Sequence, residues 1–110
     1  MGDRLLRESI KYSRKIDALS CFQESMFYRL MVTVDDFGRF YADPMLLKSA
    51  LFPVKEDLTK ASIVDAIEKL SKAGLIKVYE VGGESYLEIE GWSKEQRTRA
   101  KESKFPGIPK

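Results

Sequence analysis

The sequence of 110 residues predicts an α+β domain with the winged helix-turn-helix arrangement: a three-helix core with a small antiparallel sheet and a β-hairpin wing. Three observations predict it. Apolar residues recur at helical spacing over residues 59–73, apolar and polar residues alternate over 75–90 around a glycine pair, and two further capped helical stretches precede residue 53. A chain of this length buries roughly two thirds of its unfolded surface, so its fold requires no disulfide or metal.

The first part of the chain, residues 1–19, contains apolar residues but no sustained period. We expect an arm that packs through Leu5, Ile10, Ile16 and Leu19 without forming a long element. The globular domain is expected to cover residues 20–91, and residues 92–110 to form a basic tail or linker.

The first helix of the domain is expected to begin after Ser20, since a serine hydroxyl caps free N–H groups and Gln23 is placed to return the bond. It should run to about Thr33. Its apolar residues recur at spacings of three and four, which is typical of a core face, and they are Phe22, Met26, Phe27, Leu30 and Met31. The single cysteine, Cys21, is expected to be a small buried residue rather than a reactive thiol.

A short strand is expected at Arg39-Phe40-Tyr41, where it is placed to become the third strand beside the hairpin. Asp43-Pro44 then predicts a second helix, because Asp caps well and Pro is tolerated at the first helical position, and Pro53 should end it. The residues expected on its apolar side are Met45, Leu46, Leu47, Ala50 and Leu51.

The third helix should begin after Thr59 and end before Gly74, with Ile63, Ala66, Ile67 and Leu70 on its core face. The hairpin follows. Gly82-Gly83 suits a two-residue turn with positive φ at both central positions, which pairs Val81 with Glu84. That register places Ile76 opposite Ile89 and Val78 opposite Leu87 on one face, and Lys77 opposite Glu88 and Tyr79 opposite Tyr86 on the other.

Composition excludes several classes of enzyme. There is no histidine, so a Ser-His-Asp triad, a Cys-His dyad and a Cys/His zinc site are all impossible. Asp35, Asp36 and Asp43 are candidate ligands for a divalent cation, but a polar turn in which Asp43 caps a helix is the favoured interpretation. We therefore expect no catalytic residue, no metal, no cofactor and no small-molecule substrate. No apolar run is long enough for a membrane span or a signal peptide, which leads us to expect a cytoplasmic protein.

Charge is unevenly distributed. Residues 20–91 carry eight Lys or Arg and twelve Asp or Glu, whereas residues 92–110 carry six and two. If Ser93 caps a short helix, basic residues of the tail form a stripe suited to a phosphate backbone, with Arg99 nearby. A solvated linker is the alternative. DNA is expected to contact the basic tail and the start of the third helix. The candidate DNA-binding residues are Lys94, Arg97, Arg99, Lys101 and Lys104 in the tail, with Lys60, Lys69, Lys72 and Lys77 as secondary contacts.

The hairpin carries Glu80, Glu84, Glu88 and Glu90 against only Lys77, which disfavours phosphate contact there and leaves a protein-contact surface equally open. Tyr79 and Tyr86, on the hairpin face expected to be exposed, are candidates for contact with a partner or a base. An aromatic pair that only stabilises the hairpin is the alternative.

Short sequences spread over nearly the whole chain carry a family resemblance, and they are residues 4–10, Tyr28-Arg29-Leu30, 35–40, 73–76, Tyr79-Glu80-Val81, Trp92 with Gln96-Arg97, and 103–106. Their combination resembles the N-terminal domain of phage replisome-organiser proteins, which are similar in architecture to the winged-helix domain of DnaD-type replication initiation proteins. The resemblance implies a role in starting phage or prophage replication by binding origin DNA, self-associating and helping to bring in a helicase loader or helicase. Such proteins usually continue into a further domain, so a fragment or a short version is expected.

The predicted function is therefore DNA binding without catalysis. Two alternatives stay open: a protein-interaction or oligomerisation module, and a winged-helix transcriptional regulator that reads one duplex sequence.

Overall fold

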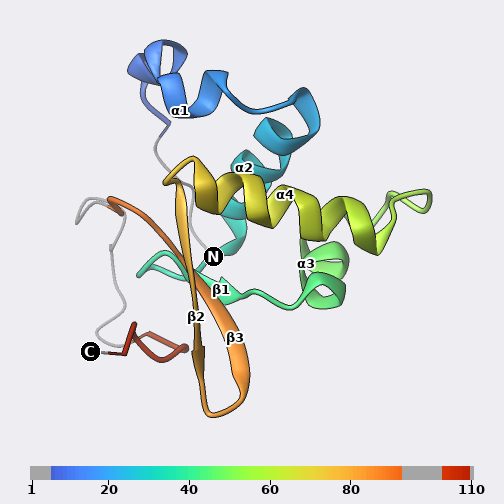
Figure 1. The fold of residues 1–110 in the computed structure, drawn as a ribbon, viewed down its shortest axis with the longest axis vertical. Coiled ribbons are helices and arrows are strands. Elements are labelled where there is room, and N and C mark those ends of the chain that lie inside the picture. The colour runs from blue at the N-terminus through green and yellow to red at the C-terminus, as the bar shows by residue number, and fades with distance from the viewer. Residues whose placement is uncertain (1–5, 93–102, 110) are drawn as a thin grey trace.

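The structure, a computed structural model, describes residues 6–92 and 103–109. Its elements, in chain order, are the 3₁₀ helix η1 (Glu8–Tyr12), α1 (Arg14–Asp17), α2 (Cys21–Thr33), β1 (Arg39–Tyr41), α3 (Pro44–Leu51), α4 (Lys60–Lys72), β2 (Ile76–Val81) and β3 (Glu84–Ile89). Helices α2, α3 and α4 gather on one side, and the β2–β3 hairpin extends away from the end of α4 (Figure 1). The α+β class is confirmed, and the order of elements is compatible with a winged helix-turn-helix.

The three main helices begin at the predicted caps. Ser20 and Gln23 form a complete capping box, with hydrogen bonds of 3.1 and 3.0 Å. The Asp43 carboxylate accepts from the N–H groups of Met45 and Leu46, and the Thr59 hydroxyl accepts from that of Ser62. These side chains satisfy N–H groups that have no partner inside the helix, which fixes where each helix starts.

The hairpin has the predicted register. Gly82 and Gly83 have φ of 61° and 84°, which an L-residue adopts only with strain, and Val81 pairs with Glu84 across the turn. The predicted third strand is also confirmed: β1 pairs with β3 in antiparallel fashion, so the sheet has the order β1-β3-β2. Strand β3 therefore lies in the centre of the sheet.

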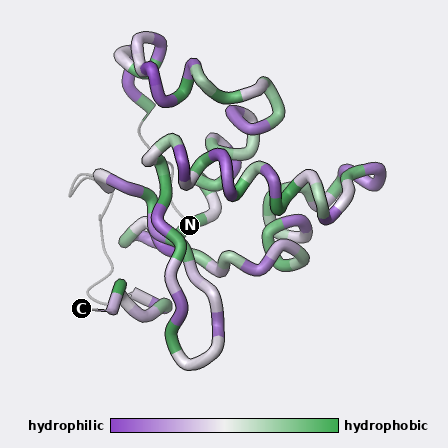
Figure 2. The backbone as a smooth tube through the Cα atoms, in the orientation of Figure 1, coloured by the Kyte–Doolittle hydropathy of each residue, from purple (hydrophilic) through white to green (hydrophobic). Residues whose placement is uncertain are grey.

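One core joins the helices to the sheet. Hydrophobic and hydrophilic residues alternate along α4, which buries one side of this helix (Figure 2). The largest side chains with no more than trace exposure come from α2 and the residue after it, α3, α4 and β3, and they are Met26, Leu30, Val34, Leu47, Ile63, Leu70 and Leu87. The predicted core faces of α2 and α4 are thus confirmed, with Ile67, Phe22 and Met31 only partly buried at their margins.

The N-terminal arm packs as predicted. Ile16 is buried, and Ile10 and Leu19 pack against the core from partly exposed positions, while Leu5 lies outside the described residues. The cap of α1 was not predicted from the sequence: the Ser13 hydroxyl accepts from the N–H of Ile16 at 3.3 Å.

Two expectations about burial in the helices are wrong. On α3 only Leu47 and Leu51 are buried, whereas Met45 and Leu46 are 54% and 45% exposed. Ala50 is exposed as well. The reason is that α3 packs through one narrow stripe at i, i+4 spacing, so neighbouring apolar positions face outwards. Cys21 is also exposed, because it is the first residue of α2 and lies ahead of the buried turns.

The hairpin offers a matched test of this core. Leu87 and Val78 are register partners, but Leu87 in the central strand is fully buried and Val78 in the edge strand is 40% exposed. We expect Leu87→Ala to lower the free energy of unfolding by about 2–5 kcal/mol, because it leaves a cavity. Val78→Ala should cost about 1 kcal/mol or less. Urea denaturation of both variants measures the difference, and equal losses would contradict the described core.

Candidate nucleic-acid interface

Three of the lysines that the sequence predicts as DNA contacts belong to helix α4. Because Ile63, Ala66 and Leu70 face the core, Lys60, Lys69 and Lys72 lie on the exposed surface of the helix. Lys60 and Lys72 are its first and last residues, so their Cα atoms lie about 18 Å apart at 1.5 Å per residue. The exposed acids Asp65 and Glu68 lie between them in sequence, and the structure therefore does not bring the helix lysines into one patch.

A basic cluster instead surrounds the turn from α4 to β2. Lys69 and Lys72 occupy the last turn of α4, and Lys77 is the second residue of β2. Lys15, from α1, reaches the same turn: its Nζ is 3.4 Å from the position that a Cβ on Gly74 would take. Cations are favourable at a helix C-terminus because the macrodipole is negative there.

Lys15 was not among the residues predicted from the sequence. Its approach to α4 depends on how the arm folds back, and Figure 1 shows α1 beside the end of α4. Acidic groups also lie close. Glu68 is on α4, and the backbone N–H of Glu90 donates to the Leu75 carbonyl at 2.9 Å, so the net positive charge of the cluster is modest.

The hairpin is acidic in its surface as well as in its sequence. Glu80, Glu84 and Glu90 are exposed, and only Lys77 opposes them. Glu88 is different: its carboxylate pairs with the Arg39 guanidinium at 2.8 Å across the β1–β3 ladder. The hairpin surface therefore supplies little that neutralises a phosphate.

Most of the predicted tail stripe lies outside the described residues, namely Ser93, Lys94, Arg97, Arg99 and Lys101. The residues on either side of it are described. The Trp92 indole N–H donates to the carbonyl of Asp36 at 2.8 Å, and the Ser103 hydroxyl donates to the Asp35 carboxylate. Trp92 and Ser103 thus bind neighbouring residues of a single turn.

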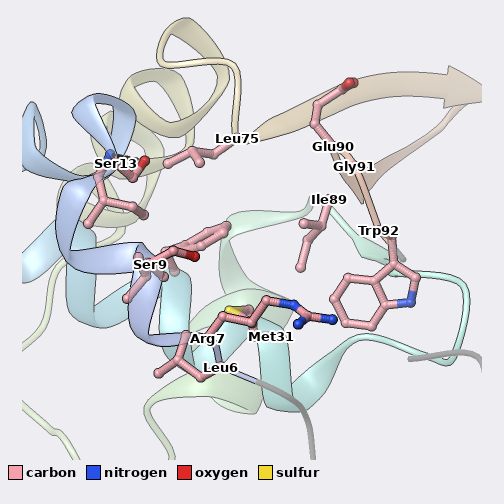
Figure 3. A pocket seen from close by; sticks show the side chains of 13 residues that line it. Leu6, Arg7, Ser9, Ser13, Met31, Leu75, Ile89, Glu90, Gly91 and Trp92 are labelled. Carbon is pink, nitrogen blue, oxygen red and sulfur yellow. Dashed lines mark hydrogen bonds between the residues drawn. The ribbon is translucent and has the colours of Figure 1, made fainter. Parts of the chain in front are cut away.

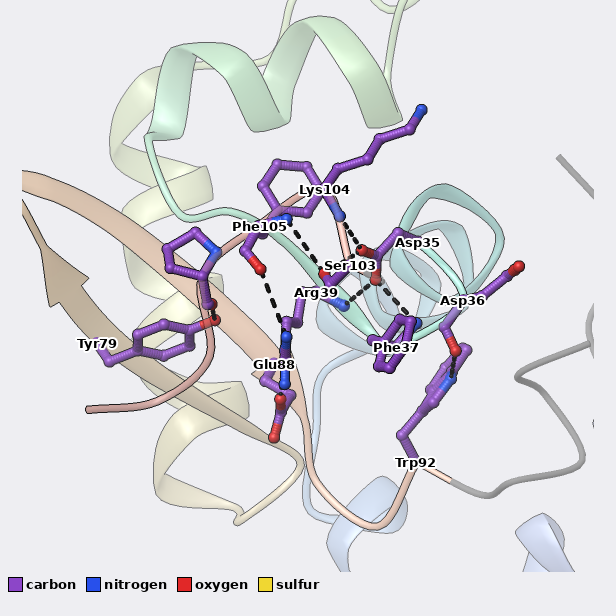
Figure 4. Close-up of polar contacts among 11 residues, drawn as sticks. Asp35, Asp36, Phe37, Arg39, Tyr79, Glu88, Trp92, Ser103, Lys104 and Phe105 are labelled. Atoms are coloured by element: carbon purple, nitrogen blue, oxygen red, sulfur yellow. Dashed lines mark hydrogen bonds and ion pairs between the residues drawn. The ribbon is translucent and has the colours of Figure 1, made fainter. Parts of the chain in front are cut away.

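Residues 103–109 are here called the C-terminal segment. Its residues Phe105 and Pro106 contact the outer face of the sheet, which is the face that carries Tyr41, Tyr79 and Tyr86 (Figure 4). The Phe105 ring lies 5.0 Å from the ring of Tyr41, 5.8 Å from that of Phe40 and 6.1 Å from that of Tyr86, measured between centroids. The linker expectation is wrong for this segment. A linker has no fixed partners, whereas these residues bury an aromatic ring against three others.

Backbone groups of the segment are also bound. The Arg39 guanidinium donates to the Phe105 carbonyl at 3.4 Å, and the Tyr79 hydroxyl donates to the Pro106 carbonyl at 2.7 Å. Lys104 has an exposed side chain, while its backbone N–H donates to the Asp35 carboxylate at 3.2 Å.

The expectation that the two hairpin tyrosines are exposed is also wrong. Tyr79 is only 8% exposed and Tyr86 is partly buried, because the C-terminal segment covers the face that the sequence left open. Their rings are 6.0 Å apart, which agrees with the cross-strand pair. Burial raises the pKa of the Tyr79 phenol above its ordinary value of 10.0.

Asp35 and Asp36 lie in a polar turn, which is the interpretation that the sequence favours over a cation site. One Asp35 oxygen accepts from the N–H groups of Phe37 and Arg39, at 2.9 and 3.0 Å, while Asp43 caps α3. Across residues 6–92 and 103–109, no three Asp, Glu, His or Cys side chains are grouped for a metal ion.

A pocket of about 340 Å³ lies between the N-terminal arm and the root of the hairpin (Figure 3). Its walls are mostly apolar and include Phe27, Met31 and Ile89. Trp92 stands at one side with Arg7 near its ring, and Glu90 lies at the rim. The pocket can accept an apolar group, but its lining contains no pairing of a nucleophile with a base.

Comparisons with protein-family models, with curated proteins and with solved structures found no match to this chain. None of the helices in the described ranges is long and apolar enough to cross a membrane.

The Tyr79 hydroxyl provides a test of the covered face. The folded chain favours the neutral phenol of Tyr79 over the phenolate. The contribution of this phenol to the free energy of unfolding is therefore fully present below pH 10.0, and it is lost as the pH rises through the raised pKa. We expect Tyr79→Phe to lower the free energy of unfolding by about 1 kcal/mol at pH 7, and ultraviolet titration should lose one phenol that ionises late. Burial and a hydrogen bond from Tyr28 to Glu24 also raise the pKa of Tyr28, to about 12, and this signal should remain.

Tyr12→Phe is the control, because Tyr12 is 78% exposed. If both variants lost the same stability and neither changed the late part of the titration, the Tyr79–Pro106 contact would be wrong.

Proposed function

We propose that this chain is a winged helix-turn-helix DNA-binding domain. In this assignment α2, α3 and α4 are the three core helices, α3 and α4 form the helix-turn-helix, and the β2–β3 hairpin is the wing. The order of elements and the sheet order β1-β3-β2 support it.

One observation carries the DNA proposal. Lys60, Lys69, Lys72 and Lys77 are all exposed, and none of them forms an ion pair within residues 6–92 and 103–109. Exposed cations without an internal partner are available to phosphates, whose neutralisation releases counterions and dominates non-specific affinity. The basic residues of the tail, which are identified from the sequence, supply further positive charge.

The proposed contact surface is therefore the end of α4 with Lys15 and the basic stretch 93–102. The start of α4, at Lys60, adds a further contact. The wing takes no large part, since its exposed glutamates repel a polyanion.

The proposed biological role is initiation of phage or prophage replication, with DNA, a second copy and a helicase loader or helicase as partners. Support comes from the sequences that carry the resemblance. The turn at 35–40, Trp92 and the residues 103–106 are far apart in the chain but are hydrogen-bonded to one another in the fold.

A protein-contact role is the second candidate, and a specific observation favours it. Met45 and Leu46 expose apolar surface on α3, and the hairpin exposes Glu80 and Glu84, so two surfaces are better suited to a protein than to DNA. The two roles are compatible in a protein that binds DNA and assembles on it. A transcriptional regulator is distinguished by a strong preference for one duplex sequence.

DNA binding is tested by fluorescence anisotropy with labelled duplex and single-stranded DNA over a salt series. We expect Lys69→Ala/Lys72→Ala to weaken binding and to lower the slope of log affinity against log salt by about 0.9 for each phosphate that is no longer neutralised. Replacing Lys94, Arg97, Arg99 and Lys101 with Gln should lower this slope further.

The control is Lys11→Ala/Lys55→Ala, which changes net charge equally at exposed positions outside the proposed surface. Equal weakening by both double variants would mean that only net charge matters and would contradict the proposed surface. Absence of binding by the unmodified chain at low salt would overturn the DNA function.

A further inference from the structure

The outer face of the sheet has the features of a binding site for a short extended peptide, and the chain fills it with its own C-terminal segment. We propose that this face recognises the sequence Ser-x-Phe-Pro followed by a small residue, and that a second copy of the chain supplies this sequence in trans. The proposal goes beyond DNA binding and does not depend on it.

The first subsite recognises a hydroxyl group and the next backbone N–H. The second oxygen of Asp35 accepts from both the Ser103 hydroxyl and the Lys104 N–H, so it fixes the direction of the peptide. The Lys104 side chain points away from these contacts and is exposed, as Figure 4 shows. The second residue of the recognised sequence is therefore unrestricted.

The second subsite is aromatic. Phe40, Tyr41 and Tyr86 surround the Phe105 ring, and the ring planes of Phe105 and Tyr41 meet at 85°, an edge-to-face arrangement. These three residues come from adjacent strands, β1 and β3, so the subsite is a product of the sheet. A side chain smaller than Phe would not reach all three rings.

The third subsite reads the backbone after the phenylalanine. Arg39 and Tyr79 donate to the carbonyls of Phe105 and Pro106, and Pro106 has no N–H that would need a partner. Proline also holds the residue before it in an extended conformation, which suits a peptide lying along a sheet. At Gly107 an added Cβ would be 3.3 Å from the Arg39 guanidinium, so a small residue fits best.

The site is built by contacts that do not involve the segment. Glu88 holds the Arg39 guanidinium, and the rings of Tyr41 and Tyr86 are stacked with centroids 5.8 Å apart. One oxygen of Asp35 is occupied by its own turn, which leaves the other for the peptide. The face is thus preorganised, a condition that favours binding of the same sequence from another molecule.

The proposed occupant is a second copy because the sequence seen in the site is present in every copy. Ten residues separate Trp92 from Ser103, so in one molecule the segment has an effective concentration on the order of millimolar. Its own segment therefore fills the site in dilute solution. At high local concentration, reciprocal exchange of identical segments joins two chains.

The peptide site is tested on the full chain with Phe105→Ala, which removes the competing side chain. A fluorescein-labelled peptide of sequence SKFPGIPK should bind this variant at least about tenfold more tightly than the unmodified chain, because the unmodified chain fills its own site. The same peptide with Phe replaced by Ala should not bind. Ser103→Asp is a second opened variant, since it places like charge against Asp35 and leaves the aromatic face intact.

Failure of the peptide to bind either folded variant would overturn the proposed site, whatever the result with DNA. The occupant is tested by mixing Phe105→Ala with Asp35→Asn. The asparagine keeps a carbonyl for the turn but presents to the segment an amide NH₂, which cannot accept from the Lys104 N–H, so it weakens the hold on the segment. A one-to-one complex in sedimentation velocity, absent for each variant alone, is expected. Peptide binding without this complex would overturn the second copy as occupant.

Discussion

The carboxylate of Asp35 holds together parts of the chain that are almost seventy residues apart. One oxygen shapes the turn into β1, and the other binds the Ser103 hydroxyl and the Lys104 N–H. This turn also places Arg39, which pairs with Glu88 in the central strand and donates to the Phe105 carbonyl. A carboxylate that accepts several N–H and O–H groups forms charge-assisted hydrogen bonds, which are stronger than those between neutral groups. The turn into β1 and the segment that covers the sheet therefore both depend on this one side chain.

Charge is divided among surfaces of the domain. Lysines gather around the end of α4, where the arm adds Lys15, whereas the hairpin is acidic and the sheet face is occupied. The exposed lysines near the end of α4 and the basic stretch carry charge that can neutralise phosphates, whereas the acidic hairpin does not. In the proposed function, this division leaves the hairpin and the exposed apolar side of α3 for protein partners, so that DNA contact and assembly would use different surfaces.

The sequence was sufficient for features that depend on neighbouring residues. The cap at Thr59 and the turn at Gly82 are local chemistry, and a period-two pattern determines the hairpin register. Features that depend on distant residues were missed. Tyr79 is covered by Pro106, Lys15 approaches α4 through the fold of the arm, and Met45 is exposed because α3 packs through a narrow stripe. No local signal in one sequence reports which segment covers which face. The candidate DNA-binding residues were identified from their charge alone, and their contact with DNA stays a prediction.

The most direct test of the covered sheet face is proton nuclear magnetic resonance of the full chain at neutral pH, aimed at the Phe105 ring. We expect nuclear Overhauser cross-peaks from the Phe105 ring protons to those of Tyr41 and Tyr86, since the ring centroids are 5.0 and 6.1 Å apart. These cross-peaks should disappear in Asp35→Asn while those between Tyr41 and Tyr86 persist. A Phe105 ring without cross-peaks to either tyrosine in the unmodified chain would contradict the covered sheet face.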